Sequence, residues 1–168
     1  MIQLFSADGI KIFQKNLSQI ILRGKGDGKF AEVVNKEVSL LPPLDNLRVI
    51  KNDRFLFAKQ SFDQWSLVSL EEQKSSEILK LISNMNIEQE ILASDYSSGQ
   101  VYFEVFGDNK NEYLNKLTHF DLRKKKFPIS TIAQTLIARI ECTIYHLENR
   151  YLITCNKSFE DYFKDCLS

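Results

Sequence analysis

The sequence predicts an α+β fold of short strands and surface helices, with antiparallel or mixed sheets. Apolar runs rich in β-branched and aromatic residues alternate with segments whose apolar residues recur at helical spacing. The order is strand, helix, strands, helix, strand, helix, strands, helix, which differs from the regular alternation of a parallel sheet. The 168 residues, 43% of them hydrophobic, suffice for a single domain over residues 1–168, or for two small lobes at about 1–90 and 91–168.

The first convincing strand covers residues 19–23, because residues 1–18 are polar and weakly patterned. Glycines within residues 24–28 end this strand. A helix over residues 30–38 follows, with apolar side chains on one face and Asp27 placed to cap it.

The glycine-rich turn between this strand and helix has two interpretations. Such turns hold phosphate groups in nucleotide-binding proteins. The spacing here is neither the dinucleotide fingerprint nor the P-loop, and no Gly-Lys-Ser/Thr follows. We therefore favour a structural turn over a phosphate site.

The middle of the chain predicts a hairpin and a helix. Residues 41–44 (Leu-Pro-Pro-Leu) end the preceding helix and form an extended connector. Strands over 54–58 and 65–70 form the hairpin, and the helix over 71–85 has acidic residues in its first turn. Trp65, the only tryptophan, is expected to be a core residue whose indole N–H is hydrogen-bonded.

The second half begins with a polar turn at residues 94–99. Asp95 in this turn either bonds nearby backbone N–H groups or supplies a carboxylate to a site, and we favour the turn. A strand over 101–106 and a helix capped by Asp108 or Asn109 follow.

The stretch from Phe127 to Arg139 is predicted to organise the fold. Pro128 favours an extended conformation at Phe127, and residues 132–140 are apolar on both faces, as in a central strand. Gln134 and Arg139 do not suit a plain core strand, because a buried amide and a permanent charge need partners. They indicate a packed polar contact or an interface.

The chain ends with a hairpin, residues 143–147 and 151–155, and a helix capped by Ser158 with an aromatic stripe. Ahead of the central strand, the basic run at residues 123–126 is interpreted as a solvated loop in preference to an anion site, since the protein has no excess of positive charge.

The charge balance and hydropathy exclude several classes of protein. With 22 basic and 22 acidic side chains, the chain lacks the positive charge needed to coat nucleic acid or an anionic membrane. No apolar run approaches the roughly 20 residues that span a bilayer, and the start lacks the pattern of a signal peptide. We expect a cytoplasmic protein.

No catalytic or metal-binding constellation is evident. Cys142, Cys155 and Cys166 lack Cys-x-x-Cys spacing and are expected to be reduced thiols. His119 and His146, the only histidines, are too few and too far apart for a recognisable metal site. There is no Gly-x-Ser-x-Gly elbow for a serine nucleophile.

Several short motifs together resemble the gamma subunit of heterotetrameric sarcosine oxidase, in the family's order and approximate spacing. They are Leu22-Arg23-Gly24, residues 63–68 (Asp-Gln-Trp-Ser-Leu-Val), residues 95–99, Phe106-Gly107, Asp121-Leu122, Phe127, residues 133–139 (Ala-Gln-Thr-Leu-Ile-Ala-Arg), and Ser158-Phe159 with Tyr162. The resemblance covers nearly the whole chain.

The resemblance implies a fold similar to the folate-binding domain of aminomethyltransferases. It also implies a non-catalytic role in a complex that demethylates sarcosine to glycine, forming hydrogen peroxide and, with tetrahydrofolate, methylenetetrahydrofolate. The alpha, beta and delta subunits are the implied partners. They are expected to carry the FAD, FMN, NAD, tetrahydrofolate and zinc of the complex.

The resemblance assigns no catalytic, cofactor or metal residue to this chain. Candidate interface or structural residues are Gln134, Arg139, Trp65, Asp95 and Phe127. With 12 Phe, 6 Tyr and 1 Trp, the aromatic content exceeds what the expected core faces hold, which predicts apolar surface for partners and self-association of the isolated chain.

Two alternatives remain. One is the equivalent small subunit of N-methylglutamate dehydrogenase. The other is a stand-alone folate-binding or aminomethyltransferase-like protein. Against the latter, residues 138–147 lack the Gly-Gly-x-x-Asp-Asp run of folate-dependent aminomethyltransferases, and Glu141 is the only acid among them.

Overall fold

A computed structural model describes residues 1–72 and 74–168. The chain forms two compact units: unit 1 contains residues 1–16 and 99–168, and unit 2 contains residues 17–98. Each unit has its own antiparallel sheet, and no parallel strand pair occurs in the described residues. The α+β prediction is therefore confirmed, with antiparallel rather than mixed sheets.

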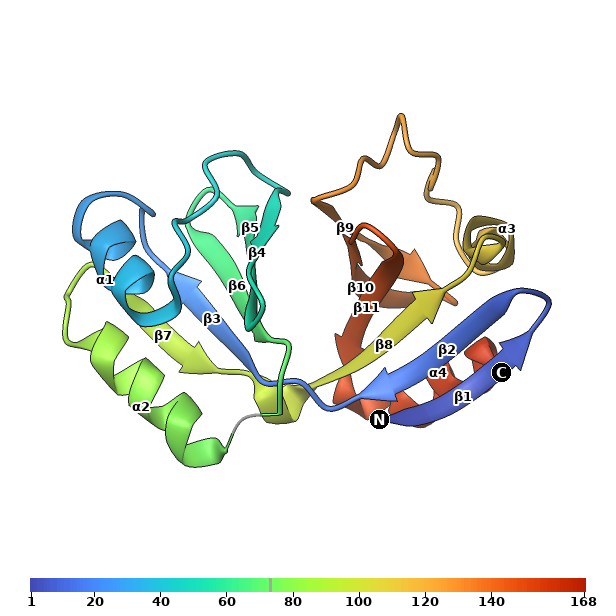
Figure 1. Cartoon of the computed structure of the whole chain (residues 1–168), viewed down its shortest axis with the longest axis horizontal. Helices are drawn as coiled ribbons and strands as arrows, with labels where there is room; N and C mark the ends of the chain where they lie inside the picture. The colour runs from blue at the N-terminus through green and yellow to red at the C-terminus, as the bar shows by residue number, and fades with distance from the viewer. Residues whose placement is uncertain (73) are drawn as a thin grey trace. The chain divides into compact units, whose positions relative to one another are not determined.

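Unit 1 is a six-stranded sheet with the strand order β1-β2-β8-β11-β10-β9 and two helices (Figure 1). Its strands are β1 Ile2–Ala7, β2 Ile10–Lys15, β8 Gln100–Phe106, β9 Thr131–Ile137, β10 Ile140–His146 and β11 Arg150–Asn156. Its helices are α3 Lys110–Asn115 and α4 Glu160–Leu167, the latter preceded by the 3-10 helix η2 Lys157–Phe159.

The core of unit 1 lies between one face of this sheet and both helices. Ile12, Phe103 and Ile153 from three neighbouring strands are fully buried with Leu114 of α3 and Phe163 of α4. The rings of Phe103 and Phe163 lie 5.1 Å apart. Successive side chains of a strand point to opposite faces of the sheet, so every second residue of these strands faces the helices.

The N-terminal segment of unit 1 corrects the sequence analysis. Residues 1–18 do not form an unpatterned lead-in, because β1 and β2 form a hairpin whose turn is Asp8 and Gly9 at φ 53° and 77°. Ile10 and Ile12 of β2 enter the core. Asp-Gly between two strands is a strong hairpin signal, since both turn residues need positive φ.

Unit 2 is a five-stranded sheet in the order β4-β5-β6-β3-β7, covered by two helices (Figure 1). Its strands are β3 Gln19–Arg23, β4 Val49–Lys51, β5 Phe55–Ser61, β6 Gln64–Ser69 and β7 Leu92–Asp95. Its helices are α1 Gly28–Val38 and α2 Ser75–Asn86, and the 3-10 helix η1 Ser97–Gly99 follows β7.

The predicted elements of unit 2 are present with shifted ends. The β5–β6 hairpin is confirmed. The helix expected over 71–85 begins later, at Ser75, so that Glu77 is the acidic residue of its first turn, and Gln73 lies outside the described residues. Phe30, Trp65 and Met85 share the core between helices and sheet.

The strand predicted over residues 132–140 is two strands. β9 and β10 are joined by a two-residue turn of Ala138 and Arg139, so that Ile137 faces Ile140. β9 is an edge strand of its sheet and not a central one. The turn is hard to recognise in the sequence because it contains none of the Gly, Asn or Asp residues that favour positive φ.

Three helix caps also differ from the prediction. Asn109 occupies the N-cap position of α3, but its side chain makes no capping hydrogen bond and donates instead to the Asp8 carbonyl at 2.9 Å. Asp27 occupies the N-cap position of α1, but its side chain makes no capping hydrogen bond. Ser158 does not cap the last helix: Asn156 is the N-cap of η2, with its Oδ1 accepting a hydrogen bond from the Ser158 N–H at 2.9 Å, and Phe159 occupies the N-cap position of α4. The helices in the described residues are all too short or too polar to cross a bilayer.

Candidate functional site

Phe127 is the centre of a buried aromatic cluster in unit 1. Its side chain is 2% exposed, and its ring lies 5.2 Å from Phe120, 5.0 Å from His146 and 5.9 Å from Tyr151. Its carbonyl oxygen lies 2.7 Å from His146 Nδ1. These contacts give Phe127 a packing role: it ties the loop before β9 to β10 and β11.

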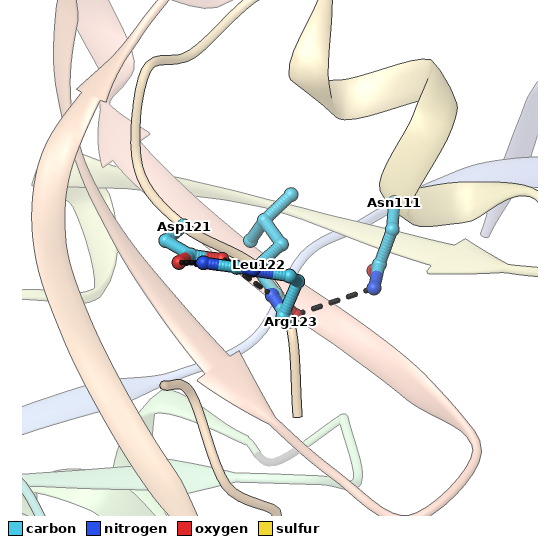
Figure 2. A network of polar contacts seen from close by, with 4 residues as sticks. All are labelled: Asn111, Asp121, Leu122 and Arg123. Carbon is cyan, nitrogen blue, oxygen red and sulfur yellow. Dashed lines mark hydrogen bonds and ion pairs between the residues drawn. The ribbon is translucent and has the colours of Figure 1, made fainter. Parts of the chain in front are cut away.

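A polar network holds an earlier part of the same loop, residues 121–123 (Figure 2). Asn111 of α3 donates from Nδ2 to the carbonyl oxygen of Leu122 at 3.2 Å, and Asn111 Oδ1 accepts from the Tyr151 hydroxyl. In the same loop, Arg123 Nε donates a hydrogen bond to Asp121 Oδ1, two residues earlier in the chain, at 2.9 Å. This hydrogen bond, with one from the Arg123 backbone, lowers the pKa of Asp121 to about 2.

The same contacts help to decide whether the basic run, residues 123–126, is a solvated loop or an anion site. Arg123 is paired with Asp121, so its charge is locally balanced. Residues 124–126 are exposed, and the chain turns there, with the Lys126 N–H bonded to the Arg123 carbonyl at 2.8 Å. This geometry favours the solvated turn over an anion site.

Trp65 is a core residue, as predicted, but its indole is not hydrogen-bonded. The side chain is 1% exposed and its ring lies 4.9 Å from Phe30. Among the described residues, its Nε1 has no partner, so the expected hydrogen bond is wrong. Lys59 Nζ lies 5.4 Å from the centre of the ring, a cation–π distance.

Asp95 forms the turn that the sequence predicts. Its Oδ1 accepts from the Ser97 N–H at 2.9 Å, and Ser97 Oγ in turn accepts from the Gln19 N–H at 3.0 Å. The carboxylate is therefore used to shape the end of β7, next to β3.

Gln134 and Arg139, expected on a packed central strand, are both exposed. The physical argument for buried partners is thus wrong, because an edge strand and a turn leave these groups in water. Their assignment to an interface stays a prediction, and their exposure makes them accessible to a partner.

Other exposed side chains lie on β9 and next to its turn. We use the name β9 surface for four exposed residues on and next to β9, namely Gln134 and Leu136 of the strand, Arg139 of the turn after it and Tyr162 of α4; Leu136 is 54% and Tyr162 52% exposed. The Tyr162 hydroxyl donates to the Ala138 carbonyl at 3.3 Å, which places α4 beside the β9–β10 turn. Exposed apolar side chains with a polar rim are typical of protein contact sites.

The outer edge of β9 is partly open. At its end, Thr118 Oγ1 donates to the Leu136 carbonyl at 2.7 Å, and the Ala138 N–H donates to the Leu117 carbonyl at 2.8 Å. No strand in the described part of the chain pairs with this edge. Unpaired edges can receive a strand from another chain.

The turn at the end of β9 is conformationally strained. Ala138 and Arg139 have φ of 51° and 67°, in the left-handed region. Non-glycine residues held there cost roughly 1–3 kcal/mol each and are enriched at functional sites. Both positive φ values are what a two-residue hairpin turn requires, so the turn joins β9 to β10 at a conformational cost.

The glycine-rich turn before α1 borders an open cavity of about 710 Å³. Its charged lining consists of Lys25, Lys29, Asp27, Glu32 and Glu90. Three carboxylates and two ammonium groups give no excess of positive charge for a phosphate. Lys29 is moreover paired with Glu32 at 3.0 Å.

One glycine of this turn has a packing explanation. Gly26 has φ 84°, and a Cβ there would lie 2.4 Å from Cζ2 of Trp65. The backbone thus lies against the tryptophan ring, which favours the structural interpretation of the turn. Within the described residues, no three His, Cys, Asp or Glu side chains are grouped as a metal ion would require.

A buried ion-pair cluster was not foreseen. Glu104 of β8 is 4% exposed and lies 2.8 Å from Arg150 Nε and 3.2 Å from Lys15 Nζ. The signal in the sequence is one acid inside the apolar run of residues 101–106. Its partners come from β2 and β11, the two strands beside β8, and only the sheet order brings them together.

The same fold occurs in solved structures of other proteins. A chain of heterotetrameric sarcosine oxidase from Corynebacterium sp. U-96, in complex with pyrrole 2-carboxylate, matches with a TM-score of 0.81 at 16% identity, covering 94% of this chain and 81% of that one. Glycine cleavage system aminomethyltransferase T from Bartonella henselae matches with a TM-score of 0.69 at 11% identity, covering 95% of this chain and 45% of that one. The chain thus spans less than half of the aminomethyltransferase. Both matches confirm the expected fold.

The sequence was also compared with curated proteins and with models of protein families. No curated protein matches the chain. The model of the sarcosine oxidase gamma subunit family matches residues 15–168, which include every element from β3 onward and the β9 surface. The chain belongs to the sarcosine oxidase gamma subunit family.

Proposed function

We propose that this chain is the non-catalytic gamma subunit of a heterotetrameric sarcosine oxidase. The observation that carries the proposal is the family match over residues 15–168. The fold shared with a chain of the Corynebacterium enzyme supports it. The complex converts sarcosine to glycine with formation of hydrogen peroxide and, with tetrahydrofolate, methylenetetrahydrofolate.

The partners in this proposal are the alpha, beta and delta subunits, and the site of contact is the β9 surface. Leu136 and Tyr162 supply apolar area, while Gln134 and Arg139 supply donors for polar contacts at its rim. The strained turn that carries Arg139 fits this role, because a partner that binds there contributes to holding its conformation.

The cofactors of the complex are assigned to the other subunits: FAD, FMN, NAD, tetrahydrofolate and zinc. Residues 138–147, where folate-dependent aminomethyltransferases have glycines and paired aspartates, supply only Glu141 as an acid. The charges around the glycine-rich turn do not favour a phosphate group. The proposal places the complex in the cytoplasm.

The test is reconstitution from the four subunits in a cytoplasmic expression host. Light scattering after size exclusion should show this chain in a stoichiometric complex, and omitting it should reduce the yield of assembled oxidase. A complex that forms and turns over sarcosine equally well without the chain would contradict the proposal. Parallel assays with sarcosine and N-methylglutamate distinguish this oxidase from N-methylglutamate dehydrogenase.

A second experiment tests the folate-binding alternative, which is considered because the chain shares its fold with aminomethyltransferase T. The isolated chain should give no heat signal on titration with tetrahydrofolate and no flavin absorbance. A dissociation constant near 1 μM, about −8 kcal/mol, would replace the proposal with a stand-alone folate-binding protein.

A further inference from the structure

Two of the three cysteines face each other across neighbouring strands of unit 1. Cys142 of β10 is in direct register with Cys155 of β11. The hairpin between these strands is closed by a hydrogen bond of 3.0 Å from the Leu147 N–H to the Arg150 carbonyl, which makes residues 147 and 150 a hydrogen-bonded pair. Since the two pair types alternate along an antiparallel ladder, Cys142 and Cys155, five positions further on, form a non-hydrogen-bonded pair.

This pair type brings the cysteines within disulfide range. In non-hydrogen-bonded pairs the Cα atoms are about 4.5 Å apart and the side chains approach most closely. Disulfides span Cα separations of about 4.4–6.8 Å. The two strands therefore need little movement to join the sulfurs.

Both thiols lie in the core of unit 1 and are free. Cys142 is 5% and Cys155 2% exposed, in the same apolar cluster as Phe163 of α4. A hydrogen bond between the two thiols raises the pKa of Cys142 and lowers that of Cys155, and burial raises the Cys142 pKa further. The direction of these shifts favours Cys155 as the attacking sulfur, and the strand register places Cys142 directly opposite it.

We propose that Cys142 and Cys155 form a reversible oxidation site, in which a hydroperoxide converts the facing thiols into a cross-strand disulfide. This inference goes beyond the role in assembly and does not depend on it. The pair differs from Cys166, which is more exposed, lies on α4 and faces no other cysteine across a strand pair.

The reaction balances without a further reagent. The Cys155 thiolate attacks one oxygen of the peroxide, the O–O bond breaks, and an alcohol, or water from hydrogen peroxide, leaves. Cys142 then attacks the resulting sulfenic sulfur; the S–S bond forms, the S–O bond breaks, and water leaves. The two thiols lose two electrons and two protons, and the peroxide gains both.

Burial sets the rate of this reaction. Because both sulfurs are almost inaccessible to solvent, the peroxide reaches them only when the segments packed over them open locally. Oxidation should therefore be slower at this pair than at Cys166, and mild denaturant should accelerate it. A thiol reagent such as dithiothreitol should reverse it.

The experiment treats the full reduced chain with hydrogen peroxide and follows free thiols, intact mass and non-reducing peptide maps. A Cys166→Ser variant removes the accessible thiol and should lose both remaining thiols together, with a mapped link between residues 142 and 155. Cys155→Ser in that background should form no intramolecular link. Circular dichroism before and after oxidation identifies any reaction that requires unfolding.

Each outcome decides the question. A reversible disulfide between Cys142 and Cys155 in the folded wild-type chain supports the proposed oxidation site. This measurement uses the wild-type protein, so it does not depend on whether a variant folds. Thiols that persist at both positions after prolonged peroxide treatment in mild denaturant, under conditions in which circular dichroism shows the chain still folded, would overturn it. So would a link found only in unfolded protein or only between chains.

Discussion

His146 Nδ1 lies 2.7 Å from the carbonyl oxygen of Phe127, so the histidine at the end of β10 anchors the loop that leads into β9. A carbonyl only accepts, so Nδ1 carries the proton of this hydrogen bond. Burial lowers the pKa of His146, and the nearby charges of Lys110 and Lys124 lower it further. The ring is also 4.8 Å from Tyr151, within the aromatic cluster of Phe127.

The first prediction is that stability depends on pH through His146. Its folded-state pKa is below the ordinary value of about 6.5, so the unfolded chain binds the proton more readily. The free energy of unfolding should be fully present above about pH 6.5 and fall as pH decreases toward the folded-state pKa. Chemical denaturation between pH 5 and 8 measures this slope.

The control for this prediction is the second histidine, His119, which is exposed. His146→Gln should flatten the slope, whereas His119→Gln should leave it unchanged. An NMR titration in which the His146 ring protonates above pH 6.5 would refute the sign of the effect.

The second prediction concerns Glu104. Glu104→Gln leaves Arg150 and Lys15 without their acid in a largely buried place, and we expect a loss on the order of 2 kcal/mol in unfolding free energy. Glu141→Gln, at an exposed position on β10, is the matched control and should change stability by less than about 0.5 kcal/mol. Equal effects of the two changes would contradict a special role for the buried cluster.

The third prediction concerns the glycine-rich turn. Gly26→Ala places a Cβ against Trp65 at a positive φ, and we expect a destabilisation of roughly 1–3 kcal/mol. Gly99→Ala is the control, because nothing lies within 4 Å of a Cβ there and its φ is not in the left-handed region. Thermal unfolding of both variants gives the comparison, and an unaltered melting temperature for Gly26→Ala would argue against the packing explanation.

The fourth prediction separates assembly from folding at the β9–β10 turn. Arg139→Gly removes the charge and also relieves the positive φ, so the isolated chain should keep or gain stability, by about 1 kcal/mol. Arg139→Leu removes the charge and keeps the strain. Both variants should bind the partner subunits more weakly, while sarcosine turnover per assembled complex stays unchanged.

Arg48→Leu, at an exposed arginine of unit 2, is the matched control for charge removal and should assemble normally. Normal assembly of both Arg139 variants, or altered turnover of the assembled complex, would show that the turn is not an assembly element. A melting temperature measured on each isolated chain excludes unfolding as the cause.

Much of the fold could be predicted because its signals are local. The strands β3, β6 and β8, the hairpin of β10 and β11, and the four helices have periodicities contained within a few residues. The β1–β2 hairpin also had a local signal, Asp8-Gly9, although the polar surroundings obscured it. The turn at Ala138 and Arg139 had no such signal, since neither residue type prefers positive φ.

By itself, the sequence determined the α+β class, most elements and the family, because these follow from local patterning and from the order of motifs along the chain. Only the tertiary structure decided that β9 lies at an edge, that Gln134 and Arg139 face solvent, and that Cys142 faces Cys155. It also decided that residues 1–16 join the sheet of residues 99–168. The reason is that strand order and register depend on hydrogen bonds between segments far apart in sequence, as between β2 and β8.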